Sequence, residues 1–388
     1  MEYKRLSECA YYSDMRTKSI SFDNYISTEN MLPDKGGVTK AGSLPETKSA
    51  SKYEVNDILL SNIRPYFRKI WLADKEGSCS NDVLVIKSKD GFMPKFLYYV
   101  LSDNNFFNYD TVTSKGTKMP RGTPRAIMKY LVPNYKEDKQ KAIVNVLSQY
   151  DSLIEVNNKR IKVLEQMAEN LYKEWFVRFR FPGYETAEFK NGIPKGWEYK
   201  TVEGLSCVLQ RGISPDYDDD GEYSVISQKC IRQSIMDFSE ARKHTKKFKS
   251  ELNILDGDTV ICSTGTGTLG RVGQVYGAYQ NTTFDSHVTL VRANNDVGSH
   301  FLFWALKNMQ PWFMNMGIGS TNQQELYRST IKNAKILVPD EASNLTERFD
   351  SYIDPIHKQI CILRDKTQNL IIQRDLLLPR LMSGKLEV

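Results

Sequence analysis

The stretch Tyr150-Asp151-Ser152-Leu153-Ile154 returns as Phe349-Asp350-Ser351-Tyr352-Ile353 in the second half of the chain. The same offset relates further pairs: Ile161 and Ile360, Leu164 and Leu363, Leu171 and Leu370. A period this long is not that of a solenoid repeat. The pattern predicts two similar halves, each a variable block followed by a long helix. Such halves present two similar surfaces to a partner of matching symmetry, and duplex DNA is the commonest such partner.

Composition bounds the class of protein. The chain has 388 residues, 40% of them hydrophobic and 26% charged, as in ordinary soluble proteins of two or more domains. Its net charge of +6 permits nucleic-acid binding without demanding it. The six cysteines form no C-x-x-C pair, which argues against a zinc site or a disulfide framework. No apolar run reaches the ~18 residues of a membrane span, so we expect a cytoplasmic protein with no membrane partner.

Residues 137–177 carry one continuous helical pattern without Gly or Pro. Apolar side chains and one asparagine, Asn157, recur at alternating spacings of four and three, which is the heptad seam of a coiled coil. The seam returns in residues 349–370, where Pro355 predicts a kink or a fresh helix start capped by Asp354. The positions expected to pair the helices are Ile154, Asn157, Ile161, Leu164, Leu171, Ile353, Ile356, Ile360, Leu363 and Leu370.

Two arrangements of the long helices fit this pattern. Each helix either belongs to the core of its own domain or pairs with the other helix. A helix of 40 residues is ~60 Å long, so an antiparallel pair would be a spacer with a globular block at each end. A lone asparagine in such a seam often fixes the register of pairing. We expect the antiparallel pair.

The repeat continues in the two globular blocks, residues 1–135 and 185–340, which both read as mixed strand and helix. The matching segments are residues 57–60 and 258–261, 83–87 and 288–292, 96–101 and 301–306, and 131–133 and 337–339. The loops between these segments differ completely. A shared scaffold with divergent loops predicts two sites that recognise different things.

Those loops and one glycine-rich strand connection carry side chains suited to nucleic acid. Arg and Lys neutralise phosphate, Arg reads guanine, and Asn or Gln reads adenine. Any one cluster also fits a solvated surface, but the position of all of them between scaffold elements favours binding. The candidate DNA contacts are Arg64, Tyr66, Arg68, Lys69, Lys115, Lys118, Arg121, Arg125, Lys243, Lys246, Lys247, Thr264, Thr266, Arg271, Thr321, Asn322 and Gln323.

No motif in the chain predicts catalysis. Residues 265–270 match G-x-G-x-x-G, but a strand-like segment follows where a dinucleotide site requires a helix. Neither a P-loop nor an adenine-methyltransferase motif occurs. The acidic side chains of residues 216–222 lack metal-ligand geometry and are predicted to form a solvated turn. We therefore expect no catalytic residue, cofactor site or metal site in this chain.

Three stretches together resemble the specificity (S) subunit of type I restriction-modification enzymes. They are Leu-Glu-Gln-Met-Ala-Glu-Asn-Leu-Tyr-Lys-Glu-Trp-Phe-Val at residues 164–177, Ile-Pro-Lys-Gly-Trp at residues 193–197, and Arg-Asp-Leu-Leu-Leu-Pro-Arg-Leu-Met-Ser-Gly-Lys-Leu at residues 374–386. The resemblance covers the whole chain in the order of that family. One departure lies at the start of the chain, which lacks the Pro-x-x-Trp formed by Pro194 and Trp197 before the second block.

The resemblance implies an α+β fold. Two globular, α/β-mixed target-recognition domains would be joined by two long antiparallel coiled-coil helices in an internal pseudo-two-fold repeat. The expected divisions are residues 1–135 for recognition domain 1, 136–182 for the central helix, 183–340 for recognition domain 2, and 341–388 for the C-terminal helix.

It also implies a function. In that family the S subunit is non-catalytic, and each recognition domain reads one half of a bipartite, asymmetric double-stranded DNA target. The helices set the gap and dock two methyltransferase (M) subunits, and two motor-nuclease (R) subunits complete the enzyme. S-adenosylmethionine, ATP and Mg²⁺ belong to these partners. The residues leave open a pseudo-symmetric coiled-coil scaffold that binds only proteins.

Overall fold

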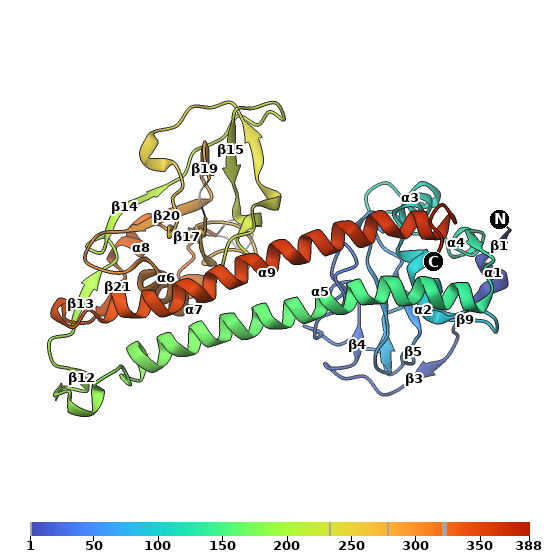
Figure 1. Ribbon diagram of the computed structural model, residues 1–388, viewed down its shortest axis with the longest axis horizontal. Helices are drawn as coiled ribbons and strands as arrows, with labels where there is room; N and C mark the ends of the chain where they lie inside the picture. The colour runs from blue at the N-terminus through green and yellow to red at the C-terminus, as the bar shows by residue number, and fades with distance from the viewer. Residues whose placement is uncertain (1, 233, 278, 320–323) are drawn as a thin grey trace. The chain divides into compact units, whose positions relative to one another are not determined.

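The repeated stretch lies on two long helices, α5 (Glu137–Tyr172) and α9 (Leu345–Met382). A computed structural model describes residues 2–232, 234–277, 279–319 and 324–388 (Figure 1). The chain forms two compact units. Unit 1 comprises Met1–Glu155 and Thr367–Val388, and unit 2 comprises Val156–Lys366. Each long helix therefore contributes one part of its length to each unit.

Unit 1 is built on two small sheets. The first has the antiparallel order β2 (Ala10–Tyr12), β9 (Val83–Ser88), β6 (Ile58–Ser61), β7 (Ile70–Leu72). The second has the order β3 (Arg16–Thr17), β5 (Ala50–Tyr53), β8 (Gly77–Cys79), β4 (Tyr25–Ile26), with β4 and β8 parallel. A separate pair joins β1 (Tyr3–Arg5) to β10 (Leu131–Pro133). The short helices are α1 (Leu6–Cys9), α2 (Pro94–Ser102), α3 (Asn104–Thr113), α4 (Pro124–Ile127) and the single 3₁₀ turn Pro65–Phe67.

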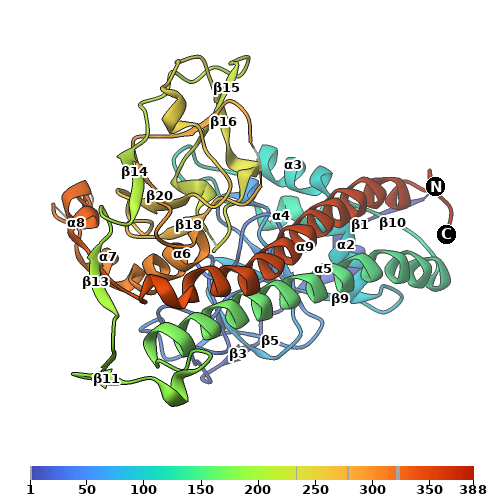
Figure 2. The same ribbon diagram turned by 60° about the vertical axis from the view of Figure 1, so that its left-hand side comes forward.

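Unit 2 repeats the antiparallel sheet of this plan, while its second sheet is arranged differently. Its antiparallel sheet has the order β14 (Ser206–Arg211), β20 (Val288–Ala293), β17 (Thr259–Cys262), β18 (Val272–Gln274). Its second sheet has the order β16 (Arg242–His244), β15 (Tyr223–Ile226), β19 (Thr282–Phe284), with β15 and β19 parallel. The separate pairs are β13 (Glu198–Thr201) with β21 (Lys335–Val338), and β11 (Phe189–Lys190) with β12 (Ile193–Pro194). The helices are α6 (Ser299–Asn308), which packs on the antiparallel sheet (Figure 2), α7 (Gln310–Asn315) and α8 (Arg328–Asn333).

Each segment matched in the sequence occupies the same place in its unit: β6 and β17, β9 and β20, α2 and α6, β10 and β21. One ion pair is repeated with them. Asp57, just before β6, pairs with Lys87 of β9 at 3.0 Å, and Asp258, just before β17, pairs with Arg292 of β20 at 2.7 Å. The repeat therefore extends from strand order to a buried charge pair that ties adjacent strands together.

The aspartate of the repeated stretch fastens each long helix to the short helix behind the antiparallel sheet. In unit 1, Asp151 of α5 accepts a hydrogen bond from the hydroxyl of Tyr99 on α2 at 2.6 Å. In unit 2, Asp350 of α9 accepts hydrogen bonds from the backbone N–H groups of His300 and Phe301 at 3.0 and 2.8 Å. These two N–H groups belong to the first turn of α6, where a helix leaves its donors without partners.

The two long helices run in opposite directions within each unit. In unit 1, Asp151 pairs with Arg374 at 2.7 Å, while Tyr135, just before α5, donates to the carbonyl of Met382 at 3.1 Å. In unit 2, Ile161 packs with Ile360 and Leu363, while Trp175, further along the chain, packs on Phe349 with ring centroids 6.0 Å apart. Of the positions expected to pair the helices, Asn157, Ile161, Ile353, Ile360 and Leu363 are buried, and Ile154, Leu164, Leu171, Ile356 and Leu370 are half-buried.

The expected restart of the second helix at Pro355 is wrong, because α9 runs unbroken from Leu345 to Met382. A proline inside a helix costs about 3 kcal/mol. Phe349 and Ile353 before it and Ile360 after it are at most 1% exposed. Packing of this buried stripe on both sides of the proline holds the helix together.

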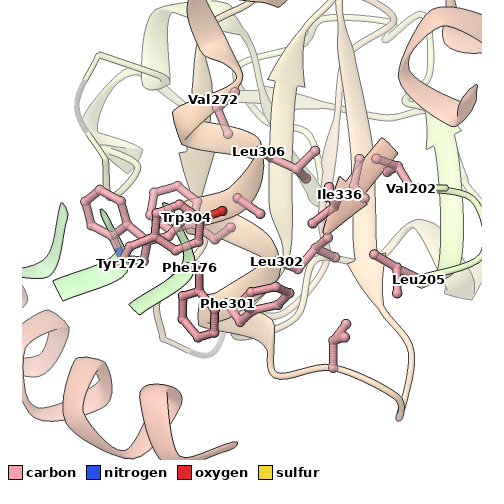
Figure 3. Packing of buried hydrophobic residues seen from close by; sticks show 14 of the residues in the cluster. Tyr172, Phe176, Val202, Leu205, Val272, Phe301, Leu302, Trp304, Leu306 and Ile336 are labelled. Carbon is pink, nitrogen blue, oxygen red and sulfur yellow. The ribbon is translucent and has the colours of Figure 1, made fainter. Parts of the chain in front are cut away.

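The core of unit 2 brings the family-like motifs together. Phe176, in the single π-helical turn Lys173–Val177 that extends α5, packs on Phe301 with ring centroids 4.7 Å apart (Figure 3). Trp197 packs on Phe179 and Phe181, with ring centroids 5.5 and 5.3 Å apart. The Trp-Phe end of the helix and the Pro-x-x-Trp turn thus form one aromatic cluster, in which Phe176 also contacts Trp197 at 6.0 Å between ring centroids.

Two buried histidines lie beside this core. His357 of α9 is 0% exposed, and neither ring nitrogen has a partner among the described residues. Its ring meets that of His300 edge-on at 4.8 Å, and His300 Nδ1 lies 2.9 Å from the side-chain oxygen of Gln274. Burial lowers the pKa of His357 to about 3 and that of His300 to about 4.

These histidines predict acid sensitivity. Both pKa values lie below the ordinary 6.5, so the unfolded chain binds more protons than the folded one at acid pH. Their contribution to stability is complete above pH 6.5 and is lost as the pH falls toward about 4 and about 3. Replacing His357 by leucine should remove about 1.4 kcal/mol per pH unit from the acid-side decline in the free energy of unfolding.

Urea denaturation followed by tryptophan fluorescence at pH 7.5, 6.5 and 5.5 measures this decline. We expect His357→Leu to lose less stability than the natural chain between pH 6.5 and 5.5. Equal losses in the two proteins would contradict the assignment.

Candidate nucleic-acid interface

In unit 1 the two basic loops found in the sequence lie side by side. Residues 62–69 follow β6, and residues 115–121 form a hairpin in which Lys115 and Arg121 exchange backbone hydrogen bonds of 2.9 and 2.8 Å. Arg121 also forms a bridge with Ile63, and the backbone N–H of Arg64 donates to the carbonyl of Pro120 at 2.8 Å. Backbone bonds thus join the loop after β6 and the hairpin into one surface, which we call the two-loop surface of unit 1.

The basic side chains of the loop after β6 differ in whether other protein groups already bind them. Lys69 donates to the backbone carbonyl of Thr28 at 2.6 Å, and burial lowers its pKa. Arg68 pairs with Asp34. Arg64 extends over the ring of Phe67 at 6.0 Å, and Tyr66 is 48% exposed. Arg64 and Tyr66 are therefore better placed for a ligand than Arg68 and Lys69, which hold the loop in shape.

The backbone of this loop is strained. Arg64 and Arg68 both have φ of 51°, in the left-handed region that non-glycine residues rarely adopt. They flank the 3₁₀ turn Pro65–Phe67. Strain of this kind costs ~1–3 kcal/mol per residue and gathers at binding sites, where the surrounding contacts enforce it.

The hairpin carries the exposed cations Lys115, Lys118 and Arg121, and Arg125 of α4 is also exposed. Among them Arg121 has an acidic partner: its Nη1 lies 2.9 Å from Oδ1 of Asp82, in the loop after β8. Asp82 is itself fixed, because its carbonyl accepts from the N–H of Asn62 at 2.8 Å. The hairpin, the loop after β6 and the loop after β8 therefore converge on Arg121.

A buried carboxylate lies under the hairpin. Asp110 of α3 is 0% exposed, and neither carboxylate oxygen has a partner among the residues the structure describes. Burial raises its pKa to about 6. A side chain at Gly122 would come within 2.7 Å of Asp110 Oδ1 and 2.8 Å of Asn62 Oδ1. Glycine is therefore required here for the hairpin to approach the loop after β6.

Unit 2 builds the same surface from different residues. Glu325 forms bridges with Thr264 and with Ile318, as Arg121 does with Ile63 and Lys115 in unit 1. The N–H of Ser263 donates to the carbonyl of His287 at 2.8 Å, as that of Asn62 does to Asp82. We call this the two-loop surface of unit 2. The backbone scaffold of the two surfaces is shared, and their side chains are unlike.

Hydroxyl, amide and imidazole groups dominate the surface of unit 2. The hydroxyl of Thr264 lies 2.6 Å from Nδ1 of the exposed His287. The hydroxyl of Thr268 donates to Gln228 Oε1 at 3.3 Å, and Thr266 is exposed. Gln228 and His287 follow the parallel strands β15 and β19, whose carboxyl ends meet at this loop. Such groups suit base edges better than phosphates.

The glycine-rich connection leads into a strand, where a dinucleotide-binding motif requires a helix. Residues 264–270 form turns, and strand β18 follows them, as the sequence predicted. Gly270 has φ of 75°, and a side chain there would lie 2.6 Å from the backbone nitrogen of Met314. The third glycine thus permits close packing against α7. Arg271 is half-buried, and its N–H donates to the carbonyl of Thr268 at 3.0 Å.

The basic cluster of residues 242–249 lies beside the acidic turn. The N–H of Asp218 donates to the carbonyl of Lys243 at 3.2 Å, and that of Thr245 donates to Asp216 at 3.1 Å. Lys243, Lys246 and Lys247 are exposed, but Lys246 donates to the carbonyl of Ser214 at 2.8 Å. Nearby carboxylates weaken the attraction of this cluster for phosphate.

The sequence did not single out Asp82, Gln228, His287 or Tyr217. Arg242 stacks on the exposed ring of Tyr217 at 3.7 Å, and the negative charge of Asp285 adds to burial in raising the pKa of that tyrosine. Asp82 follows β8, which pairs in parallel with β4, while Gln228 and His287 follow the parallel strands β15 and β19, so only strand pairing places them. Of the predicted contacts, Thr321, Asn322 and Gln323 lie outside the described residues.

Two further features are absent from the described part of the chain. None of its helices is long and apolar enough to cross a membrane. No group of three or more His, Cys, Asp or Glu side chains in the same part of the chain could hold a metal ion.

A duplicated, mixed α/β chain with a polar two-loop surface on each copy belongs to the class of modular recognition proteins. Residues 13–166 and 194–362 match the family model of the type I restriction modification DNA specificity domain. The chain therefore belongs to this family and is a specificity subunit of the type I restriction-modification kind. It contains two copies of the family's DNA-recognition domain.

Relatives support this assignment. The type I restriction enzyme MjaIX specificity subunit of Methanocaldococcus jannaschii is 24% identical over 309 residues, which cover 77% of this chain and 71% of the relative. The HindI specificity subunit of Haemophilus influenzae is 21% identical, with 93% and 94% covered. The crystal structure of an S subunit from M. genitalium has a TM-score of 0.54 at 14% identity, covering 98% of this chain and 96% of that one. That structure shares the fold.

The exposed lysines of the hairpin predict a salt-dependent contribution to DNA binding. Each phosphate contact adds about 0.9 to the slope of log affinity against log salt. The double variant Lys115→Gln, Lys118→Gln should therefore reduce the slope by about 1.8 and weaken binding to all duplexes alike.

Fluorescence anisotropy of labelled duplexes at several KCl concentrations measures the slope. The matched control is Lys243→Gln, Lys247→Gln, beside the acidic turn, which should change the slope less. A larger effect of the control pair would refute this division between the two clusters.

Proposed function

We propose that this chain is the DNA-reading subunit of a type I restriction-modification complex and that each unit reads one half of a bipartite, asymmetric target. One observation carries the proposal: the same two-loop surface occurs in both units with unlike side chains. Arg121 in unit 1 and Glu325 in unit 2 occupy equivalent places and have opposite charges. Two surfaces with the same backbone scaffold but unlike side chains would read two different half-site sequences, so the target would be asymmetric.

The long helices serve as the spacer in this proposal. Residues 1–135 and 183–340 are the recognition domains, and residues 136–182 and 341–388 form an antiparallel coiled coil with pseudo-two-fold symmetry. The support is the buried seam on both helices and their opposite directions within each unit, given by Asp151 with Arg374 and by Ile161 with Ile360. A continuous helical pair is stiff, so it would fix the number of unread base pairs between the half-sites.

The outer faces of the helices support docking of partner subunits. Long helices with a buried seam still expose apolar side chains: Leu153, Val163 and Met167 on α5, and Ile362, Ile372 and Leu376 on α9, each between 46% and 61% exposed. Exposed apolar residues that gather on one element mark protein interfaces. Two M subunits would dock along these helices, and two R subunits would complete the complex.

In this account the chain performs no chemistry. Binding would position the M subunits over an adenine in each half-site, and methyl transfer and cleavage would use S-adenosylmethionine, ATP and Mg²⁺ held by the partners. The complex would act in the cytoplasm, where it meets the DNA. The exposed apolar faces also fit the alternative, a scaffold that binds only proteins, and that alternative predicts no sequence preference on DNA.

The spacer role predicts the outcome of a paired insertion. Seven residues added after Glu155 in α5 and seven after Lys366 in α9 preserve the heptad seam. They lengthen the pair by about 10 Å, at 1.5 Å per residue. At 3.4 Å per base pair the unread gap should grow by about three base pairs, and both half-sites should stay the same.

The measurement is a genome-wide map of N6-methyladenine in a methylation-free host that co-expresses the chain with its methyltransferase subunit. The natural chain should give one split motif, methylated on both strands. An unchanged gap in the insertion variant would reject the spacer. Methylation without a motif, or a stable complex without methylation, would favour the protein-only scaffold.

A further inference from the structure

Arg121 is the residue at which the three loops of the unit 1 surface meet. Its backbone pairs with Ile63 on one side and with Lys115 on the other. Its side chain is 52% exposed, and Nη1 lies 2.9 Å from Asp82 Oδ1. Its Nε and Nη2 have no hydrogen-bond or ion-pair partner among the residues that the structure describes, so one edge of the guanidinium is open to a ligand. A planar fork held in place by a carboxylate is pre-organised for a bidentate contact.

The acidic partner distinguishes Arg121 from its basic neighbours. A carboxylate beside the guanidinium cancels much of its charge and would repel a phosphate. Lys115 and Lys118 are exposed, and no described carboxylate pairs with either of them, so they suit phosphates. A guanine edge is neutral and presents two acceptors, O6 and N7, which match the two free donors of a held arginine.

We propose that Arg121 reads a guanine in the half-site of unit 1 and that Asp82 is the positioning residue that orients it. The inference rests on the proposed function and assigns one base of the target to one residue. It also restricts that base to one half-site. Glu325 holds the equivalent place in unit 2 and pairs with Arg211 at 2.6 Å, so the half-site of unit 2 is read differently at this position.

Three variants distinguish a base contact by Arg121 from a role in folding and from non-specific electrostatic attraction to DNA. Arg121→Lys keeps the positive charge and removes the planar fork. Arg121→Gln removes both. Asp82→Asn keeps the shape of the positioning residue and removes its charge. The contrasting variant is Lys118→Gln, at the exposed tip of the same hairpin, which should lower methylation at all sites together and leave the motif as it is.

The experiment maps N6-methyladenine for each variant co-expressed with the methyltransferase subunit. Purified complexes are then tested for binding in competition between duplexes that differ only at the assigned base pair. We expect Arg121→Lys and Arg121→Gln to reduce the preference for guanine at that one position by roughly 5- to 150-fold. Asp82→Asn should reduce it less, and the other half-site should be unchanged in all three.

The outcomes distinguish failure of the Arg121 assignment from failure of the proposed function. A natural motif without guanine in either half-site, or an unaltered guanine preference in Arg121→Gln, overturns the assignment and leaves the proposed function standing. Loss of preference at several positions of both half-sites would show a structural role and also overturns it. Absence of any motif for the natural chain would overturn the proposed function itself.

Discussion

The fold depends on one half-buried carboxylate in each unit, the aspartate of the repeated stretch. Asp151 accepts from Tyr99 of α2, and Asp350 accepts from the first turn of α6. Burial, which is the largest cause, raises the pKa of Asp350 to about 6 even though the two N–H donors act to lower it, so these donors offset only part of the desolvation cost. Because α2 and α6 pack on the antiparallel sheets, this bond transmits the position of the long helix to the strands β6 and β17. The loops that follow those strands form the two-loop surfaces, so each surface is held at a fixed place relative to the helix that carries it.

In the two-loop surfaces the backbone determines a shared shape, and the side chains differ between the units. Their shape comes from backbone hydrogen bonds, such as those that Arg121 and Glu325 make at equivalent places, and these bonds do not depend on side-chain identity. Side chains at the same positions are therefore free to change. Unit 1 presents arginine and lysine over a strained loop, while unit 2 presents threonine, glutamine and histidine. Under the proposed function, one scaffold serves two different recognition tasks within a single chain.

The buried faces of the long helices and the equivalent elements of the two units could be predicted, because a repeat and a hydrophobic period can be read directly from the sequence. The heptad seam marked the buried face of both helices, and the matched segments marked equivalent strands and helices. Pairings between distant loops could not be predicted. The places of Asp82 and His287 at these surfaces could not be predicted, because they depend on the parallel pairing of β8 with β4 and of β19 with β15. The position of the acidic turn beside Lys243 likewise depends on the register of β16. The expected break at Pro355 does not occur, because packing of Phe349, Ile353 and Ile360 outweighs the tendency of proline to end a helix. The helix preferences of single residues do not include such packing.

The central claim is that the two units read DNA independently on a shared frame. The most direct measurement exchanges residues 183–340 for the equivalent block of another family member and maps N6-methyladenine in the same methylation-free host. Trp197 and the aromatic cluster around Phe176 should be preserved at the junction, so that the new block docks on the same helix. The account predicts a new sequence in one half-site, with the other half-site and the gap unchanged. Simultaneous change of both half-sites would contradict it, because the units would then not be separate readers.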